Sequence, residues 1–232
     1  MVYFYYILLA VLSYFVGNVT FGRVISRAKH GDITKHGSGN PGTLNAWRTF
    51  GFWAGIMTFG LDMAKGALMC LVAKFGFAEL GCNPEIAVYV AGFSVVLGHI
   101  FPVIFKFKGG KGIATSIGVF LVANWLWALI ALVVMIVAML FIKFASILTI
   151  GYVIVLSIVE ICLCNPANWI NYILISGILA LVLYAHRANI KRLLTGKENK
   201  TELLKMVKGL GKKKEKKEEV VETQPQEETI EK

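Results

Sequence analysis

The chain has 232 residues, of which 56% are hydrophobic and only 16% are charged, and its mean hydropathy is +0.66. A soluble domain carries about 25% charged residues, so the composition excludes a soluble globular protein and favours one polytopic membrane domain. The basic residues behind the net charge of +10 flank apolar segments, and no nucleic-acid-reading module is recognisable, which excludes nucleic-acid binding. The four cysteines, Cys70, Cys82, Cys162 and Cys164, lack metal-ligand spacing and are interpreted as packing residues.

Apolar segments that approach the roughly 20 residues of a membrane-spanning helix follow one another along the chain. The first, Val2 to Phe21, has no basic start before it and no small-residue cleavage pattern after it, so it predicts a retained helix rather than a signal peptide. Further crossings are predicted at residues 50–73, 86–104, 146–163 and 169–185.

Loop charge predicts the topology, because basic loop residues prefer the cytoplasmic side. They form four groups: Arg23, Arg27, Lys29, Lys35 and Arg48; Lys106, Lys108 and Lys111; Lys143; and Arg187, Lys191 and Arg192. With all four inside, the apolar stretch 112–142 has both ends inside and should form two short helices with a turn near Asn124-Trp125. The prediction is an all-α bundle of seven transmembrane helices, with the N-terminus outside and the C-terminus in the cytoplasm.

The chain divides by charge after Gly196. Residues 1–196, the predicted membrane domain, hold 14 Lys and Arg against 5 Asp and Glu, a net of +9. Residues 197–232 hold 10 Lys and 9 Glu, a net of +1. This segment is too polar to bury a core and is predicted to be a disordered, solvated cytoplasmic tail, with a lipid-surface anchor as the alternative.

A run dense in glycine and amides, GSGNPGTLNAWR over Gly37–Arg48, precedes the second apolar segment. The glycines and the Asn-Pro pair predict a tight loop with exposed backbone. Ser38, Asn40 and Asn45 supply hydrogen-bonding groups, and Arg48 supplies a forked cation suited to a phosphate. An ordinary turn with a surface arginine is the alternative, but the density of glycines and amides favours a binding loop.

A second motif combines Gly98-His99-Ile100-Phe101-Pro102 with FKGGKGIAT over Phe107–Thr115. Its Gly-rich turn contains Lys111 and opens onto a helix predicted to begin near Ile113. A helix N-terminus offers free N–H groups and partial positive charge to an anion, although the spacing of a nucleotide-binding P-loop is absent. A flexible basic linker is the alternative; the Gly-Gly-Lys-Gly run favours a phosphate site.

A third motif, HRANIKRLLTGKE over His186–Glu198, follows the last apolar segment. His186 and Asn189 are three residues apart and share one face of a helix; a catalytic role and a helix-capping role for His186 are left open at this point. Within the second apolar segment, Asp62 and Lys65 are also three apart. They predict a structural ion pair, because pairing is the least costly way to keep two charges there, with a catalytic pair as the alternative.

Together and in this order, the three motifs resemble the bacterial acyl-phosphate-dependent glycerol-3-phosphate acyltransferases. The matching patterns are GSGNxG with a downstream Arg, GHxFP…FKGGKGxAT and HRxNIxRLxxGxE, and the resemblance covers residues 3–198. It implies a seven-helix cell-membrane fold with a cytoplasmic active site, in agreement with the loop charges. It also implies acyl transfer from acyl phosphate to the 1-hydroxyl of glycerol 3-phosphate, giving lysophosphatidic acid and inorganic phosphate in the first acylation of phospholipid synthesis.

By position in the motifs, the resemblance implies five catalytic residues: Ser38, Arg48, Lys111, His186 and Asn189. The implied substrate-binding residues are Gly39, Asn40, Asn45, His99, Gly109, Gly110, Gly112, Thr115 and Ser146. Glu198 takes a structural role, as do Asp62 and Lys65. The family usually reads G-A-T-N where this chain has Gly42-Thr43-Leu44-Asn45, so a substrate contact by the displaced Thr hydroxyl is not carried over.

An acyl phosphate already has a good leaving group, so no covalent serine intermediate is required, and the sequence has neither a G-x-S-x-G elbow nor a His-x4-Asp pattern. Direct attack by the glycerol hydroxyl is expected, with His186 or a substrate phosphate oxygen accepting the proton. Arg48, Lys111 and the Gly109–Gly112 amides are expected to neutralise the two phosphates. No cofactor or metal is expected. The expected partners are glycerol 3-phosphate, acyl phosphate, membrane lipid and an enzyme that produces acyl phosphate.

Two other classes of protein compete with this interpretation. A transporter or channel for a phosphate-bearing metabolite would use the same basic loops, but it predicts polar residues across the membrane and internal repeats, and neither is evident. A non-enzymatic membrane scaffold would leave the three motifs without a purpose.

Overall fold

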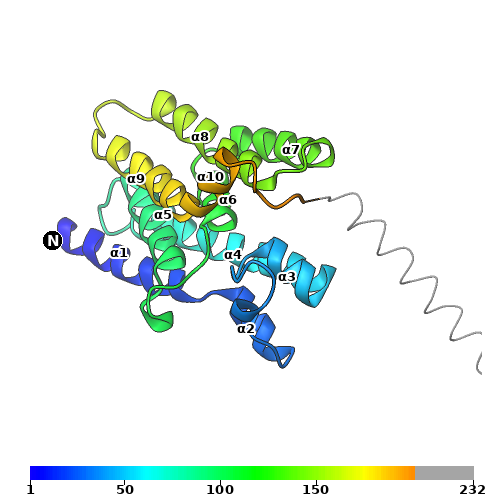
Figure 1. The fold of residues 1–232 in the computed structure, drawn as a ribbon. Coiled ribbons are helices and arrows are strands. Elements are labelled where there is room, and N and C mark those ends of the chain that lie inside the picture. The colour runs from blue at the N-terminus through cyan, green and yellow to red at the C-terminus, as the bar shows by residue number, and fades with distance from the viewer. Residues whose placement is uncertain (202–232) are drawn as a thin grey trace, which may run out of the picture.

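The computed structural model describes residues 1–201, and every regular element in that range is helical (Figure 1), which confirms the predicted all-α class there. The α-helices are α1 (Val2–Asn18), α2 (Phe21–Ala28), α3 (Thr43–Phe50), α4 (Phe52–Leu71), α5 (Pro84–Ile100), α6 (Ile113–Ala123), α7 (Trp125–Phe141), α8 (Ala145–Leu163), α9 (Ile170–Ala185) and α10 (Arg187–Leu194). Short turns η1 (Ile33–Lys35) and η3 (Val103–Phe105) are 3-10 helices, and η2 (Val72–Gly76) is a π-helical extension of α4.

Four segments of the described chain are long and apolar enough to cross a membrane: Val2–Ala28, Phe52–Gly76, Pro84–Phe105 and Ala145–Leu163. The pair α9 and α10, bent by 59°, is a fifth candidate. The shorter α6 and α7 meet at Asn124, which confirms the predicted break in 112–142. The 11 residues of α6 extend about 16 Å at 1.5 Å per residue, about half of a hydrocarbon core. The count of seven crossings and the orientation of the termini therefore stay predictions.

Helix α5 lies at the centre of the bundle, packed against α1, α4, α6 and α9. Its start follows from local sequence, because the Asn83 side chain accepts hydrogen bonds from the Glu85 and Ile86 amides and Pro84 occupies the first turn. From this central position α5 carries His99 to the end of the bundle where the motifs lie.

The four groups of basic residues gather at one end of the bundle. Arg23 donates to the carbonyl of Lys108 over 2.8 Å, which joins the first group to the second. Lys111 contacts Asn189 beside the last group, and Arg48 reaches Thr201, whose amide donates to the carbonyl of Lys143. Their common location is what the loop-charge argument requires.

A buried cluster ties α1, α4 and α5 together at this end. The predicted ion pair is present, with Lys65 Nζ 2.8 Å from Asp62 Oδ1. Lys65 also donates to the carbonyls of Gly17 and Val19, where α1 ends, and its Nζ lies 2.8 Å from Nδ1 of His99, which is itself 3.5 Å from Asp62 Oδ1. These contacts agree with a structural role for Asp62 and Lys65.

Helices α4 and α6 approach closely because glycine stands at their crossing. A Cβ atom on Gly118 would overlap the carbonyl oxygen of Met63. We expect Gly118→Ala to lower the free energy of unfolding by about 1–3 kcal/mol, the usual cost of overpacking, in thermal melts in detergent. Gly151→Ala is the matched control, because a Cβ there meets no atom within 4 Å. Equal melting temperatures for the two variants would contradict this account of the crossing.

Candidate active site

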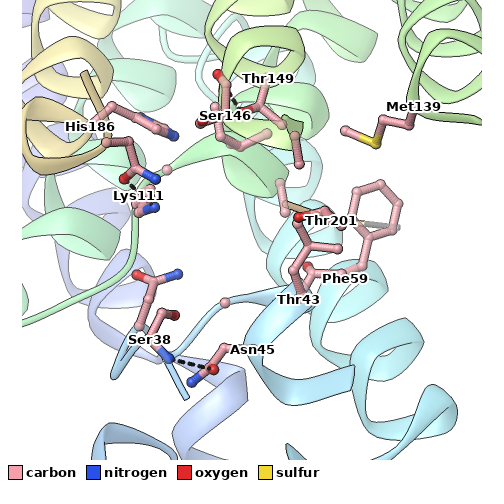
Figure 2. Close-up of a pocket in the computed structure, with 18 of the residues that line it drawn as sticks. Ser38, Thr43, Asn45, Phe59, Lys111, Met139, Ser146, Thr149, His186 and Thr201 are labelled. Carbon is pink, nitrogen blue, oxygen red and sulfur yellow. Dashed lines mark hydrogen bonds between the residues drawn. The ribbon is translucent and has the colours of Figure 1, made fainter. Parts of the chain in front are cut away.

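One cavity at the end of the bundle that bears the motifs collects residues from all three of them (Figure 2). All five predicted catalytic residues line it: Ser38, Arg48, Lys111, His186 and Asn189. They come from the loop before α3, α3 itself, the loop before α6, the α9–α10 bend and α10. Residues separated by up to 151 positions in sequence thus surround one space.

The first motif forms a loop that is held by the buried side chain of Asn45. Its Oδ1 accepts from the Ser38 amide over 3.0 Å, and its Nδ2 donates to the carbonyls of Ile33 and His36. Gly37 has φ +58° and a Cβ there would overlap Asn45 Oδ1, so glycine is required at this position. Asn45 is therefore a residue that positions Ser38, with its amide already engaged by the loop.

The second motif places Lys111 and the start of α6 at the cavity. The amides of Gly109 and Gly110 donate to the carbonyls of Ile100 and His99, so these two amides are not available to a ligand, contrary to expectation. A Cβ on Gly110 would overlap Nε2 of His99, which shows that the glycines let the loop close over that ring. Gly112, at φ +83°, caps α6 where it was expected to begin, and the first turn of α6 remains directed at the cavity.

The third motif carries a hydrogen-bonded chain that ends on Lys111. Lys111 Nζ donates to Asn189 Oδ1 over 2.6 Å, and Asn189 Nδ2 donates to Glu198 Oε1 over 2.6 Å. Glu198 also accepts from Arg192 Nε over 2.8 Å and from Ser146 Oγ over 2.9 Å. The structural role predicted for Glu198 has a concrete form here, since its carboxylate joins α8 and α10 and fixes Asn189.

His186 lies at the bend between α9 and α10, is only 2% exposed, and points into the cavity above Lys111 in Figure 2. Its Nδ1 lies 2.8 Å from the carbonyl oxygen of Val182. A carbonyl only accepts, so Nδ1 carries the proton and Nε2 is an acceptor. The ring is therefore oriented to receive a hydrogen bond from a ligand.

Burial sets the charge state of the cavity's lysine. It lowers the pKa of Lys111 to about 8, with Glu198 opposing the shift and Arg192 and Arg48 adding to it. Burial also acts to raise the pKa of Glu198, but the hydrogen bonds from Asn189, Arg192 and Ser146 outweigh it and leave that pKa below its usual value. At neutral pH the cavity thus holds a lysine cation and an ionised glutamate that is already paired.

The other half of the cavity is apolar. Its side chains come from α4, α6 and α7: Phe59, Ile113, Ile117, Leu132, Met135, Ile136 and Met139. Methionine and branched aliphatic side chains adapt to a flexible hydrocarbon. A cationic region that continues into an apolar one fits an amphiphile with an anionic head.

Most of the predicted substrate-binding residues also line the cavity: Asn40, Asn45, His99, Gly112 and Ser146. Gly39, Gly109, Gly110 and Thr115 do not belong to its lining in the described chain. Thr115 is fully buried at the α4–α6 crossing. Thr43, whose hydroxyl is displaced relative to the family pattern, lines the cavity even so.

Several polar residues of the lining were not predicted from the sequence: Thr149, Arg192, Asn199 and Thr201. Arg192 lies within the third motif and Thr149 follows Ser146 by three positions on one helix face, so both had a sequence signal. Asn199 and Thr201 had none. They belong to the predicted tail, whose first residues, 197–201, lie against the cavity, whereas 202–232 fall outside the described residues.

Comparison with known proteins assigns the family. The model of the family described as glycerol-3-phosphate acyltransferase matches residues 7–196. A glycerol-3-phosphate acyltransferase of Clostridioides difficile (strain 630) is 38% identical over 198 residues, which cover 85% of this chain and 96% of that protein. One of Aquifex aeolicus (strain VF5) is 36% identical over 192 residues, covering 83% and 97%.

The fold agrees with solved structures. PlsY, an integral membrane glycerol 3-phosphate acyltransferase, superposes in its glycerol 3-phosphate form with a TM-score of 0.77 at 33% identity, covering 87% of this chain and 98% of that one. Its lysophosphatidic acid form gives 0.75. The sequence matches, the helical fold and the shared cavity of the three motifs lead to one conclusion: this chain is an integral membrane protein that belongs to the glycerol-3-phosphate acyltransferase family.

Proposed function

We propose that this protein transfers a fatty acyl group from acyl phosphate to the 1-hydroxyl of sn-glycerol 3-phosphate, giving lysophosphatidic acid and inorganic phosphate. The observation that carries the proposal is the divided cavity, in which Lys111 and Arg48 stand at a polar region that continues into an apolar one. Two cations match two phosphate groups, one on each substrate, and the apolar side chains match the fatty chain. Enzymes named for glycerol 3-phosphate among the relatives support the acceptor.

In the proposed reaction the glycerol oxygen attacks the carbonyl carbon of the acyl phosphate directly. The new C–O ester bond forms, the bond between the carbonyl carbon and the phosphate oxygen breaks, and inorganic phosphate leaves with the electron pair. Lys111 and Arg48 hold the two phosphates together against their mutual repulsion and stabilise the charge that develops. Nε2 of His186, an acceptor in its present tautomer, receives the hydrogen bond of the attacking hydroxyl. The hydroxyl proton leaves to this nitrogen or to a phosphate oxygen, and it ends on the inorganic phosphate that is released.

The loop charges support a topology for this reaction. All four basic groups lie at the end of the bundle that bears the cavity. By the preference of basic loops for the cytoplasm, this end faces the cytoplasm of the cell membrane, with seven crossings and the N-terminus outside. An acyl-phosphate-producing enzyme would then deliver its product on the same side.

The test uses purified protein in detergent or a lipid mesophase, with glycerol 3-phosphate and either palmitoyl phosphate or palmitoyl-CoA. Lysophosphatidate should form with palmitoyl phosphate only, accompanied by one phosphate per product. Product with the thioester only would keep the acyltransferase and overturn the donor. The absence of product with both donors, from protein shown to be folded, would favour the transporter.

The rate should depend on the charge of Lys111. Because the pKa of Lys111 lies at about 8, the lysine is charged below that pH and neutral above it. We expect kcat/KM for glycerol 3-phosphate to fall about tenfold per unit above this pKa, as the cation titrates. Lys111→Arg stays charged, so its kcat/KM should not show this fall with pH, whatever its absolute rate. A wild-type profile that is flat to pH 9.5 would contradict the role of the charge.

Two variants of His186 should separate the possible proton acceptors. His186→Ala removes the acceptor for the hydroxyl, so kcat should fall roughly a hundredfold or more. His186→Asn offers a carbonyl that can orient the hydroxyl but cannot take its proton. Activity retained by the asparagine variant would assign the proton to a phosphate oxygen, whereas equal losses in the two variants would assign it to the imidazole. A near-normal kcat for the alanine variant would remove His186 from both roles.

A further inference from the structure

The described chain continues past the family match, which ends at residue 196. Residues 197–201, the C-terminal strap, follow α10 and return along the cavity, where Glu198, Asn199 and Thr201 are part of the lining. In the view of Figure 2, Thr201 lies across the cavity from His186 and Lys111, near Thr43 and Phe59. The end of the strap, at Thr201, therefore reaches the side of the cavity that lies across from His186 and Lys111.

Thr201 makes two hydrogen bonds that fix it in place. Its amide donates to the carbonyl of Lys143, in the turn between α7 and α8, over 2.5 Å. Its Oγ1 accepts from Nη2 of Arg48 over 2.6 Å. The threonine is only 7% exposed. Thr201 thus connects the strap to the α7–α8 turn and to Arg48 of α3.

Arg48 needs such a partner more than the other cation does. It stands in the last turn of α3 and its side chain is only partly buried, so that it still has rotamers to lose when it binds a ligand. Lys111, in contrast, is already held by Asn189. The contact with Thr201 uses one of the five N–H donors of the guanidinium and leaves the others for a phosphate.

The chemistry of the partner matters. A hydroxyl accepts a hydrogen bond without neutralising the guanidinium, whereas a carboxylate at the same place would compete with the phosphate for its charge. The carboxylate that is near, Glu198, is engaged by Arg192, Asn189 and Ser146 instead. The arrangement orients Arg48 and keeps its positive charge available.

We infer that Thr201 is a positioning residue for the acyl transfer, which holds the Arg48 guanidinium across the cavity for the phosphate of glycerol 3-phosphate. This inference rests on the proposed function. It makes Thr201, which lies beyond both the third motif and the family match, a part of the active site of this protein.

The experiment is a double-mutant cycle between Thr201 and Arg48. The rate of each variant is measured with a radiolabelled-product assay that detects rates over several orders of magnitude. Thr201→Val keeps the shape and loses the acceptor, so it should lower kcat/KM for glycerol 3-phosphate roughly tenfold, mainly through KM. Thr201→Ser should restore it. In the Arg48→Ala background, Thr201→Val should have no further effect, because there is no guanidinium to position.

Thr195→Val is the matched control. Within residues 1–201 the Thr195 hydroxyl is exposed and donates to the carbonyls of Lys191 and Arg192 in the adjoining helix, so its loss should leave the rate unchanged. An undiminished or increased kcat/KM in Thr201→Val, or an equal loss with and without Arg48, would overturn the inference. If Thr201→Val lowers the melting temperature, Thr201→Ala repeats the cycle. Failure of this inference can be told apart from failure of the proposed function, because in the second case the wild type itself would form no lysophosphatidate.

Discussion

Replacing Lys111 with methionine should lower kcat/KM for both substrates by about 10²–10³, the cost of removing one preorganised charge from a water-excluded site. Methionine keeps most of the apolar stem and removes only the ammonium. The variant loses the cation at the polar region of the cavity, and it also leaves Asn189 Oδ1 without the donor that lies 2.6 Å away. Steady-state rates with palmitoyl phosphate and glycerol 3-phosphate, each varied in turn, measure the effect.

Lys108→Met provides the control for this experiment. Lys108 belongs to the same Gly-rich motif and has the same formal charge, but its side chain is exposed and does not contribute to the described lining of the cavity. Its known contact, with Arg23, uses the backbone carbonyl and survives the substitution. A Lys111 variant within fivefold of the wild type, or a Lys108 variant that is equally impaired, would refute the assignment of the phosphate-binding cation.

Replacing Glu198 with alanine should reduce both activity and stability. The carboxylate is 5% exposed and accepts from three side chains, Asn189, Arg192 and Ser146. Its loss leaves the buried Asn189 and Ser146 groups unpaired, which should cost about 2 kcal/mol of unfolding free energy. Because Asn189 then no longer holds Lys111, kcat/KM should fall roughly a hundredfold as well.

Thermal melts in detergent and steady-state rates measure the two consequences together. Glu198→Gln should give an intermediate result, since its carbonyl can still accept while its amide opposes Arg192. The pKa of Glu198 lies below its usual value, so its stabilising contribution is present at neutral pH and is lost as pH falls through that pKa. Glu79→Ala, at an exposed position, should match the wild type. A Glu198→Ala variant as active and as stable as the wild type would show that the hydrogen bonds to Glu198 do not position Asn189 and Lys111.

Much of the architecture follows from local patterns. Apolar segments of about 20 residues with few charges predict membrane helices, because lipid offers no partner to an unpaired backbone group and a helix satisfies its own. The break at Asn124 was predictable from loop charge, because basic residues at both ends of 112–142 place both ends on one side of the membrane, and the break is present. The start of α6 after Gly112 was predictable from the Gly-Gly-Lys-Gly run, since glycine readily adopts the left-handed conformation with which the loop turns into the helix.

Tertiary packing decided the rest. The sequence by itself determined which residue types carry the chemistry, because Ser38, Arg48, Lys111, His186 and Asn189 stand in three motifs dense in polar groups. It did not determine that the amides of Gly109 and Gly110 are engaged by Ile100 and His99, since those partners depend on how the loop folds over α5. Nor could it name the apolar residues that line the cavity among many similar side chains, or place Thr201 on Arg48. A contact between residues 153 positions apart leaves no local pattern, because only the packing of α3, the α7–α8 turn and the C-terminal strap brings the two side chains together.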